Sequence, residues 1–222
     1  MKTEDLFINV STISEKYIRE FNYPYKILPN IKDIILELGR NLNSDYNNIG
    51  NDIWIHKNAK VDESARIIGP CIIDSNAEIR CFAFIRGNVI VGKNSVVGNS
   101  CEIKNSILFD YVQVPHFNYV GDSILGYKAH LGAGAIISNL KSDKSNVFIK
   151  NNSEVIDTNL KKVGAFLGDY VEIGCNSVIN PGTVIGSNTS IYPLTSVRGV
   201  IDKDSIVKSM DNIIRKRDIE GV

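Results

Sequence analysis

Residues 85–103 read IRGNVIVGKNSVVGNSCEI, and within this stretch an aliphatic residue recurs at every sixth position. The same spacing extends to both sides, through Ile55, Val61, Ile67, Ile73, Ile79, Ile85, Val91, Val97, Ile103 and Phe109. Neither the 3.6-residue period of an α-helix nor the two-residue period of a plain strand fits it. The spacing predicts an all-β fold, a parallel β-helix in which each hexad is one short strand plus a corner and three hexads make one coil.

The frame of the repeat is expected to slip at Pro115. It then resumes, breaks again for a long polar stretch, and returns, with apolar residues at Tyr119, Leu125, Leu131, Ile137, Leu167, Ile173, Ile179, Ile185, Ile191 and Val197. Glycine often follows the aliphatic residue, which suits tight corners because glycine tolerates positive φ. The pattern resembles that of left-handed parallel β-helices, and it predicts six to seven coils over residues 52–205.

The two ends of the chain do not follow the repeat. Residues 1–51 predict a small helical cap and a linker, because Thr12 and Glu15 form a capping-box pattern and Asn30 precedes an apolar helical stripe that Gly39 is expected to end. Within the β-helix, the polar interruption at about 140–163 contains a short alternating run, 147–149. It predicts an extruded loop or hairpin with a mobile tip, reaching toward a neighbouring subunit. Residues 206–222 form a tail, and a short helix is predicted from Ser209 to Arg217.

Composition excludes several classes of function. Lys plus Arg and Asp plus Glu both number 25, so no overall field favours nucleic acid or an anionic membrane. The first residues lack the apolar core of a signal peptide, and a cytoplasmic location is expected. The four cysteines stand singly, without the spacing of a metal site, and are interpreted as small apolar residues.

His116 is the candidate general base. It follows Pro115 where the frame is expected to slip, which would hold it at a corner outside the stacked core. An imidazole accepts a proton from an amine or hydroxyl near neutral pH. The alternative is an ordinary exposed histidine in a turn. Tyr119 could donate a hydrogen bond to a sugar oxygen, but it is also in phase with Leu125 and could instead point into the core.

Arg86 and Lys104 are the candidate phosphate ligands. They are one full coil apart and each follows an inward residue, so both should project from the same face of the β-helix and form a clamp. The alternative is a ladder of solvated charges, which the neighbouring Glu102 favours. Asn139 lies where the chain leaves the repeat and could orient an acyl carbonyl, unless it is a plain turn asparagine.

A β-helix wall has no deep cleft, so a site is expected in the groove between two packed copies. A closed threefold assembly would supply three such grooves.

The residues around these candidates carry a family resemblance. Residues 97–104 (VGNSCEIK), 116–122 (HFNYVGD), 131–134 (LGAG) and Ser138-Asn139 resemble the acetyltransferase domain of the bifunctional N-acetylglucosamine-1-phosphate uridylyltransferase/glucosamine-1-phosphate acetyltransferases. They are closer still to archaeal-type sugar-1-phosphate nucleotidyltransferases with the same tail. The similarity covers about residues 53–205. The nucleotidyltransferase half has no counterpart in this sequence, so uridylyl transfer is not expected.

The resemblance implies a role for each candidate. His116 would deprotonate the amine of an amino-sugar 1-phosphate, Asn139 would orient the acetyl group of acetyl-CoA, and Arg86, Lys104 and Tyr119 would hold the sugar phosphate. His130 stands where bacterial members have a sugar-binding asparagine, and Leu140 replaces a tyrosine. Lys141 and Lys144 are candidates for a substrate-binding lysine of the following loop. Cys175 and Tyr192 fall near positions that contact the cofactor.

Three hypotheses therefore compete. The first is a homotrimeric, acetyl-CoA-dependent N-acetyltransferase acting on glucosamine 1-phosphate or galactosamine 1-phosphate. The second is a non-catalytic trimerising module that partners a sugar nucleotidyltransferase. The third is a zinc-dependent β-helix hydratase using His56, His116 and His130, which the sequence disfavours because it lacks a His-x4-His pair and His56 lies more than three coils away. No metal site is expected.

Overall fold

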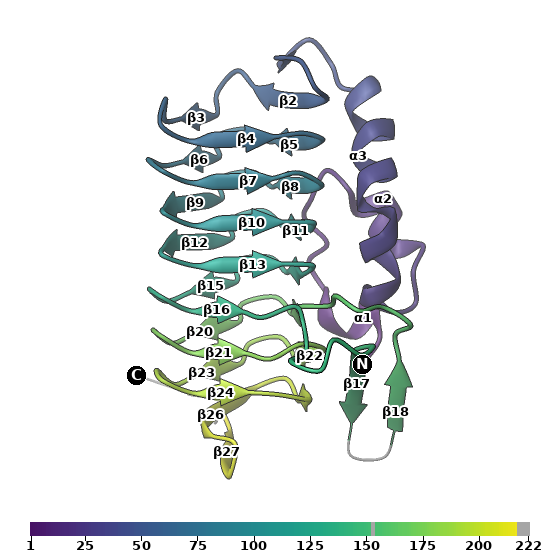
Figure 1. Cartoon of the computed structure of the whole chain (residues 1–222), viewed down its shortest axis with the longest axis vertical. Helices are drawn as coiled ribbons and strands as arrows, with labels where there is room; N and C mark the ends of the chain where they lie inside the picture. The colour runs from purple at the N-terminus through teal and green to yellow at the C-terminus, as the bar shows by residue number, and fades with distance from the viewer. Residues whose placement is uncertain (152–153, 217–222) are drawn as a thin grey trace.

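The computed structural model describes residues 1–151 and 154–216 and forms a three-sided parallel β-helix (Figure 1). Sheet A has the order β1 (Tyr46–Asn48), β2 (Ile53–His56), β5 (Cys71–Ile73), β8 (Val89–Val91), β11 (Ser106–Leu108), β14 (Ile124–Leu125), β19 (Ala165–Leu167), β22 (Thr183–Ile185), β25 (Val200–Ile201). Sheet B has the order β27 (Asn212–Arg215), β26 (Ser205–Ser209), β23 (Ser190–Ile191), β20 (Glu172–Ile173), β15 (His130–Leu131), β12 (Gln113–His116), β9 (Val96–Asn99), β6 (Glu78–Ile79), β3 (Lys60–Val61). Sheet C has the order β24 (Ser196–Val197), β21 (Val178–Ile179), β16 (Ile136–Ile137), β13 (Tyr119–Gly121), β10 (Glu102–Lys104), β7 (Phe84–Arg86), β4 (Arg66–Ile68).

The expected β-helix is confirmed, but it has about eight coils, not six to seven. Val197 is the last position of the six-residue spacing that the sequence shows. In the structure β25 and β26 continue the stack, with Ile201 paired to Ile185 and Val207 paired to Ile191. Both residues are buried. The coil persists there because the inward positions stay aliphatic although the spacing between them shortens.

The frame slips earlier than expected. Val91 pairs with Leu108, which is seventeen residues further on, so the corner after Ile103 is one residue shorter than its neighbours. Leu108, not Phe109, is therefore the inward residue, and Phe109 packs under the N-terminal segment against Phe7. Two further residues, Val114 and Val120, follow in register with Val97 and Ile103. The inward position is thus Val120, and Tyr119 points away from the core.

The N-terminal helices cover sheet A (Figure 1). They are α1 (Thr3–Leu6), α2 (Glu15–Arg19), the 3-10 helix η1 (Pro24–Asn30) and α3 (Ile31–Arg40). Outward residues of sheet A such as Ile72 and Ile90 are fully buried beneath them. On sheets B and C the outward positions are mostly open to solvent. The outward residues of sheet A are therefore largely covered by the chain itself, whereas those of sheets B and C are more exposed.

Three details of the helical cap differ from expectation. Gly39 does not end its helix, which continues to Arg40. Its role is close packing, because a Cβ at this position would lie 2.5 Å from the Trp54 ring of β2. The Thr12–Glu15 capping box does not form, since Ser14 is the N-cap residue of α2 and has no side-chain capping hydrogen bond. Asn30 is the N-cap residue of α3, but its amide donates instead to the Lys26 carbonyl.

The polar interruption forms the expected hairpin, with β17 (Phe148–Asn151) antiparallel to β18 (Glu154–Asp157). Its tip, residues 152–153, lies outside the described residues. The predicted C-terminal helix is wrong over the described residues, because β27 pairs antiparallel with β26. The β-branched Ile213 and Ile214 favour an extended chain that takes up the free edge of the last coil. Among the described residues, no helix is long and apolar enough to cross a membrane.

Candidate functional site

The main predicted site residues form two groups, one at each of the two corners where the strands of sheet C begin and end. His116, at the end of β12, lies at the corner between sheets B and C, whereas Asn139 lies two residues beyond β16 at the corner between sheets C and A. Strand β13 separates the two corners, and at about 3.3 Å per residue its three residues hold them roughly 10 Å apart. One chain therefore does not bring the candidate base and the candidate acyl-orienting amide together.

His116 is exposed at its corner, as expected, although the cause is not a slip at Pro115. Its backbone N–H donates to the Asn118 side chain (3.0 Å), and its carbonyl accepts from the Gly134 N–H (3.0 Å). The following residue, Phe117, has φ of 52°, so the chain turns sharply and leaves the imidazole outside. In the described part of the chain, no side-chain hydrogen bond or ion pair engages this imidazole. The ring is therefore accessible to a ligand.

The second group gathers around a carboxylate that sequence reasoning missed. Asp122 is 4% exposed and follows Gly121 at the corner between sheets C and A. Its carboxylate accepts from Lys104 Nζ (3.2 Å), Asn105 Nδ2 (2.9 Å) and Asn139 Nδ2. The acid thus binds one candidate phosphate ligand and orients the candidate acyl-binding amide. Polar corner residues are common throughout the repeat, so no sequence signal distinguishes this one.

Tyr119 completes this group. Burial, and then the charges of Asp122 and Glu102, raise the pKa of its phenol, and a hydrogen bond with the Asn139 side chain opposes that shift. The phenol therefore stays protonated near neutral pH and can donate. A Cβ at Gly121 would lie 2.6 Å from both Tyr119 Oη and Asn139 Nδ2. Glycine leaves the space in which these two side chains meet.

Arg86 and Lys104 are stacked on adjacent strands of sheet C, as their spacing predicted. Each is held by an acid, however: Arg86 pairs with Glu102 and Lys104 with Asp122. The hydrogen bond that Arg86 donates to Glu102, and then the charge of Glu102, raise the pKa of the Arg86 guanidinium. The two cations are therefore largely neutralised within the chain, which weakens their use as a phosphate clamp.

The remaining predicted residues lie apart from the Asp122 group. His130 Nδ1 is 2.7 Å from Glu172 Oε2 on sheet B, and Lys144 is an exposed turn residue of the loop after β16. Cys175 is exposed two coils below His116 at the same corner, and Tyr192 is exposed on the next coil. Across the described ranges, no three His, Cys, Asp or Glu side chains of one chain are grouped to hold a metal ion.

We expect Asp122→Asn to destabilise the fold by about 2 kcal/mol, because it removes the charge from a buried acceptor of three donors and leaves Lys104 without its partner. Urea unfolding measures the loss. Glu78→Gln is the matched control, since it breaks the exposed pair with Arg80 and should cost less than about 1 kcal/mol. Equal losses in both variants would contradict the structural role of Asp122.

The fold and the repeat together define a hexapeptide-repeat β-helix protein. Residues 67–163 match the family model described as the GMPPB C-terminal domain. The chain is 36% identical over 220 residues to the bifunctional protein GlmU of Methanococcus aeolicus, covering 84% of the chain and 53% of that relative. It is 31% identical over 164 residues to the bifunctional sugar-1-phosphate nucleotidylyltransferase/acetyltransferase of Sulfurisphaera tokodaii, covering 65% of the chain and 41% of that relative. The chain is thus related to these proteins and spans about half of their length or less.

Proposed function

We propose that this protein is an acetyl-CoA-dependent N-acetyltransferase whose acceptor is an amino-sugar 1-phosphate such as glucosamine 1-phosphate or galactosamine 1-phosphate. The observation that best supports this proposal is the position of two groups at opposite ends of the strands of sheet C. The exposed His116 lies at one end, and Asn139 with Tyr119 lies at the other. Both lie within residues 67–163, the stretch that matches the model of the GMPPB C-terminal domain. A base on one side and a carbonyl-orienting amide on the other are what direct acyl transfer to an amine needs.

In the proposed reaction, the amine nitrogen of the acceptor attacks the thioester carbonyl of acetyl-CoA. His116 takes the proton that the amine loses as the C–N bond forms. A backbone N–H stabilises the oxyanion, and Asn139 orients the acetyl group. The C–S bond then breaks, the leaving sulfur takes up a proton, and free CoA and the N-acetylated sugar phosphate result.

A second copy of the chain would complete the site. The two groups of residues are a strand length apart in one chain. The corner between sheets B and C of one copy would therefore have to face the corner between sheets C and A of its neighbour. Sheet A cannot take part because helices cover it. Exposed Phe82, Phe117 and Leu194 lie at the B–C corner and support its burial against another copy. A closed homotrimer uses such a heterologous contact three times.

The other predicted residues take supporting roles in this proposal. Cys175 and Tyr192 follow His116 toward the C-terminal coils and would contact acetyl-CoA. His130, held by Glu172, and Lys144 would contact the acceptor and distinguish one sugar from another.

The test is to incubate the purified protein with acetyl-CoA and each of the two amino-sugar phosphates and to follow the release of free thiol. We expect acceptor-dependent release of CoA, and mass spectrometry should show one acetyl group on the sugar. Absence of turnover on every amino-sugar phosphate, together with no CoA-dependent rise in Tm, would reject the enzyme and leave the non-catalytic trimerising module as the better account.

A further inference from the structure

A cavity of about 550 Å³ opens beside Asn139, on the side away from Lys104. Its wall includes Ser138 and Leu140, the two neighbours of Asn139. The loop that follows contributes Lys141, and β17 of the hairpin contributes Lys150. The corners of the next two coils contribute Asn180 and Arg198. The cavity thus borders the segment that carries Asn139.

The hairpin is held firmly against the β-helix, so the cavity is part of the fold. Gly182 has φ of +77°, and a Cβ there would lie 2.8 Å from the Phe148 carbonyl oxygen. Gly199 has φ of +80°, and its Cβ would lie 3.2 Å from the Lys150 carbonyl oxygen. Val147 and Ile149 of the same segment are buried. Glycine at these two corners lets the strand approach closely and fixes where Lys150 lies.

The charges in this cavity are unbalanced. Three cations, Lys141, Lys150 and Arg198, line it with one acid, Asp143. That acid is paired with Lys141 (3.3 Å). Within residues 1–151 and 154–216, no ion pair or side-chain hydrogen bond engages Lys150 or Arg198. They differ in this from Arg86 and Lys104, whose charges are met by Glu102 and Asp122.

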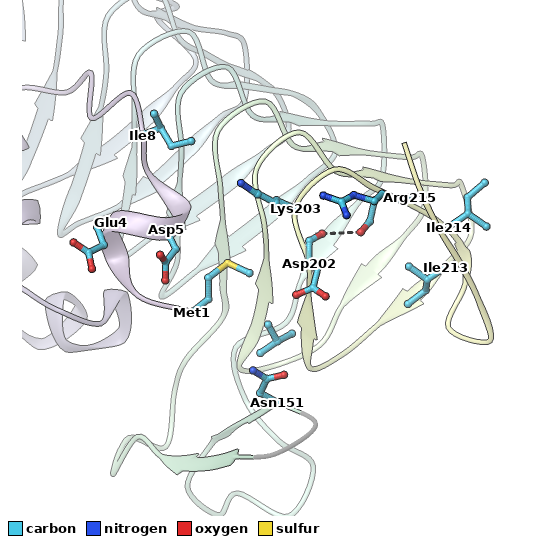
Figure 2. Close-up of a pocket in the computed structure, with 12 residues that line it drawn as sticks. Met1, Glu4, Asp5, Ile8, Asn151, Asp202, Lys203, Ile213, Ile214 and Arg215 are labelled. Atoms are coloured by element: carbon cyan, nitrogen blue, oxygen red, sulfur yellow. Dashed lines mark hydrogen bonds between the residues drawn. The ribbon is translucent and has the colours of Figure 1, made fainter. Parts of the chain in front are cut away.

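The larger cavity of the protein provides a contrast (Figure 2). It has a volume of about 770 Å³ and lies between α1, the last coils and β27. Its wall carries Glu4, Asp5 and Asp202 against Lys203 and Arg215. With the N-terminal ammonium of Met1, which also lines this cavity, the cations and acids there are equal in number, so its lining does not favour an anion.

We propose that the cavity bounded by Lys141, Lys150 and Arg198 binds the phosphate or diphosphate group of a substrate, in place of the predicted Arg86–Lys104 clamp. The inference rests on the proposed function, since the ligand would extend from here to Asn139. Lysine and arginine without internal partners give charge-assisted hydrogen bonds to phosphate oxygens, and arginine does so with two parallel N–H groups. The phosphate belongs either to the acceptor or to CoA.

The first experiment is calorimetric titration with inorganic pyrophosphate at low ionic strength, which requires no turnover. The Lys150→Ala/Arg198→Ala double variant is expected to bind at least tenfold more weakly than the natural protein. Arg66→Ala is the matched control, because Arg66 is an exposed arginine on sheet C at the far end of the β-helix. It should bind as the natural protein does. No pyrophosphate binding by the natural protein, or equal binding by the double variant, would overturn the proposal.

The second experiment identifies the source of the phosphate. In steady-state kinetics the double variant should raise one KM at least tenfold with little change in kcat. A rise for the sugar phosphate assigns the cavity to the acceptor, and a rise for acetyl-CoA assigns it to the cofactor. No change in either KM would contradict the inference. Normal pyrophosphate binding without turnover on any acceptor would reject the proposed function but keep the anion site.

Discussion

Replacing His116 with alanine is expected to lower the rate of acetyl transfer by about 10²- to 10⁴-fold, the usual contribution of a general base. The fold should be unaffected, because the imidazole is exposed and no side-chain partner engages it within the described part of the chain. The substitution leaves Pro115 and Phe117 in place, so the corner that carries the side chain is retained. The measurement is kcat/KM for the best acceptor, with Tm recorded on the same preparation.

His56→Gln is the control for this variant. His56 lies in the first coil, where its ring packs edge-on against Tyr46 and its Nδ1 accepts from the Asn58 N–H. Its substitution should change stability slightly and leave turnover as in the natural protein. Natural activity in the His116→Ala protein would remove the histidine from the mechanism, whatever the His56 variant does.

Gly98→Ala is expected to give the largest loss of stability, about 3 kcal/mol or more. A Cβ at this position would lie 1.6 Å from the Pro115 carbonyl oxygen and 2.2 Å from its carbon. Both are backbone atoms of the adjacent coil, and Val97 and Val114 pair across the same two strands. The coils would have to separate to admit a methyl group. Urea unfolding monitored by circular dichroism measures the effect.

The control is Gly50→Ala, which separates backbone strain from steric conflict. Gly50 has φ of +98°, but a Cβ there meets nothing within 4 Å. It should cost about 1 kcal/mol, from strain alone. If the two variants were equally destabilised, close packing between the coils would not be the reason for glycine at position 98. Because Gly98 lies directly against Pro115, its substitution should also displace His116 and lower activity.

The sequence-based predictions agree best with the structure in the coils, where equivalent positions have the same surroundings from one coil to the next. Ile73 and Val91 pair across adjacent coils, so each position contacts its equivalent in the next coil and the spacing alone indicates the fold. The hairpin was predictable for the same reason, since its alternating residues follow the two-residue period of a strand. The ends of helices were less predictable. Gly39 has the sequence pattern of a helix end, but the reason for glycine at this position is its close contact with the ring of Trp54, which is distant in the sequence.

The candidate site was predictable in its residues and not in its assembly. Periodicity placed Arg86 and Lys104 on one face, and local turn chemistry left His116 exposed. The sequence does not show that a corner one residue shorter turns Tyr119 away from the core. Nor does it show that Asp122 engages Lys104 and Asn139, because hydrogen bonds between coils depend on which residues the register brings together.

By itself, then, the amino-acid sequence determined the β-helix, its hairpin and the exposed histidine, because each depends on a short period or a local turn. Tertiary structure alone decided which cations are neutralised and which stay available. Arg86 and Lys104 meet acids sixteen and eighteen residues away along the chain, whereas Lys150 and Arg198 come from a hairpin and a distant coil and meet at one cavity. Which acid each cation meets depends on the register between coils, and no repeat in the sequence encodes the approach of Lys150 to Arg198.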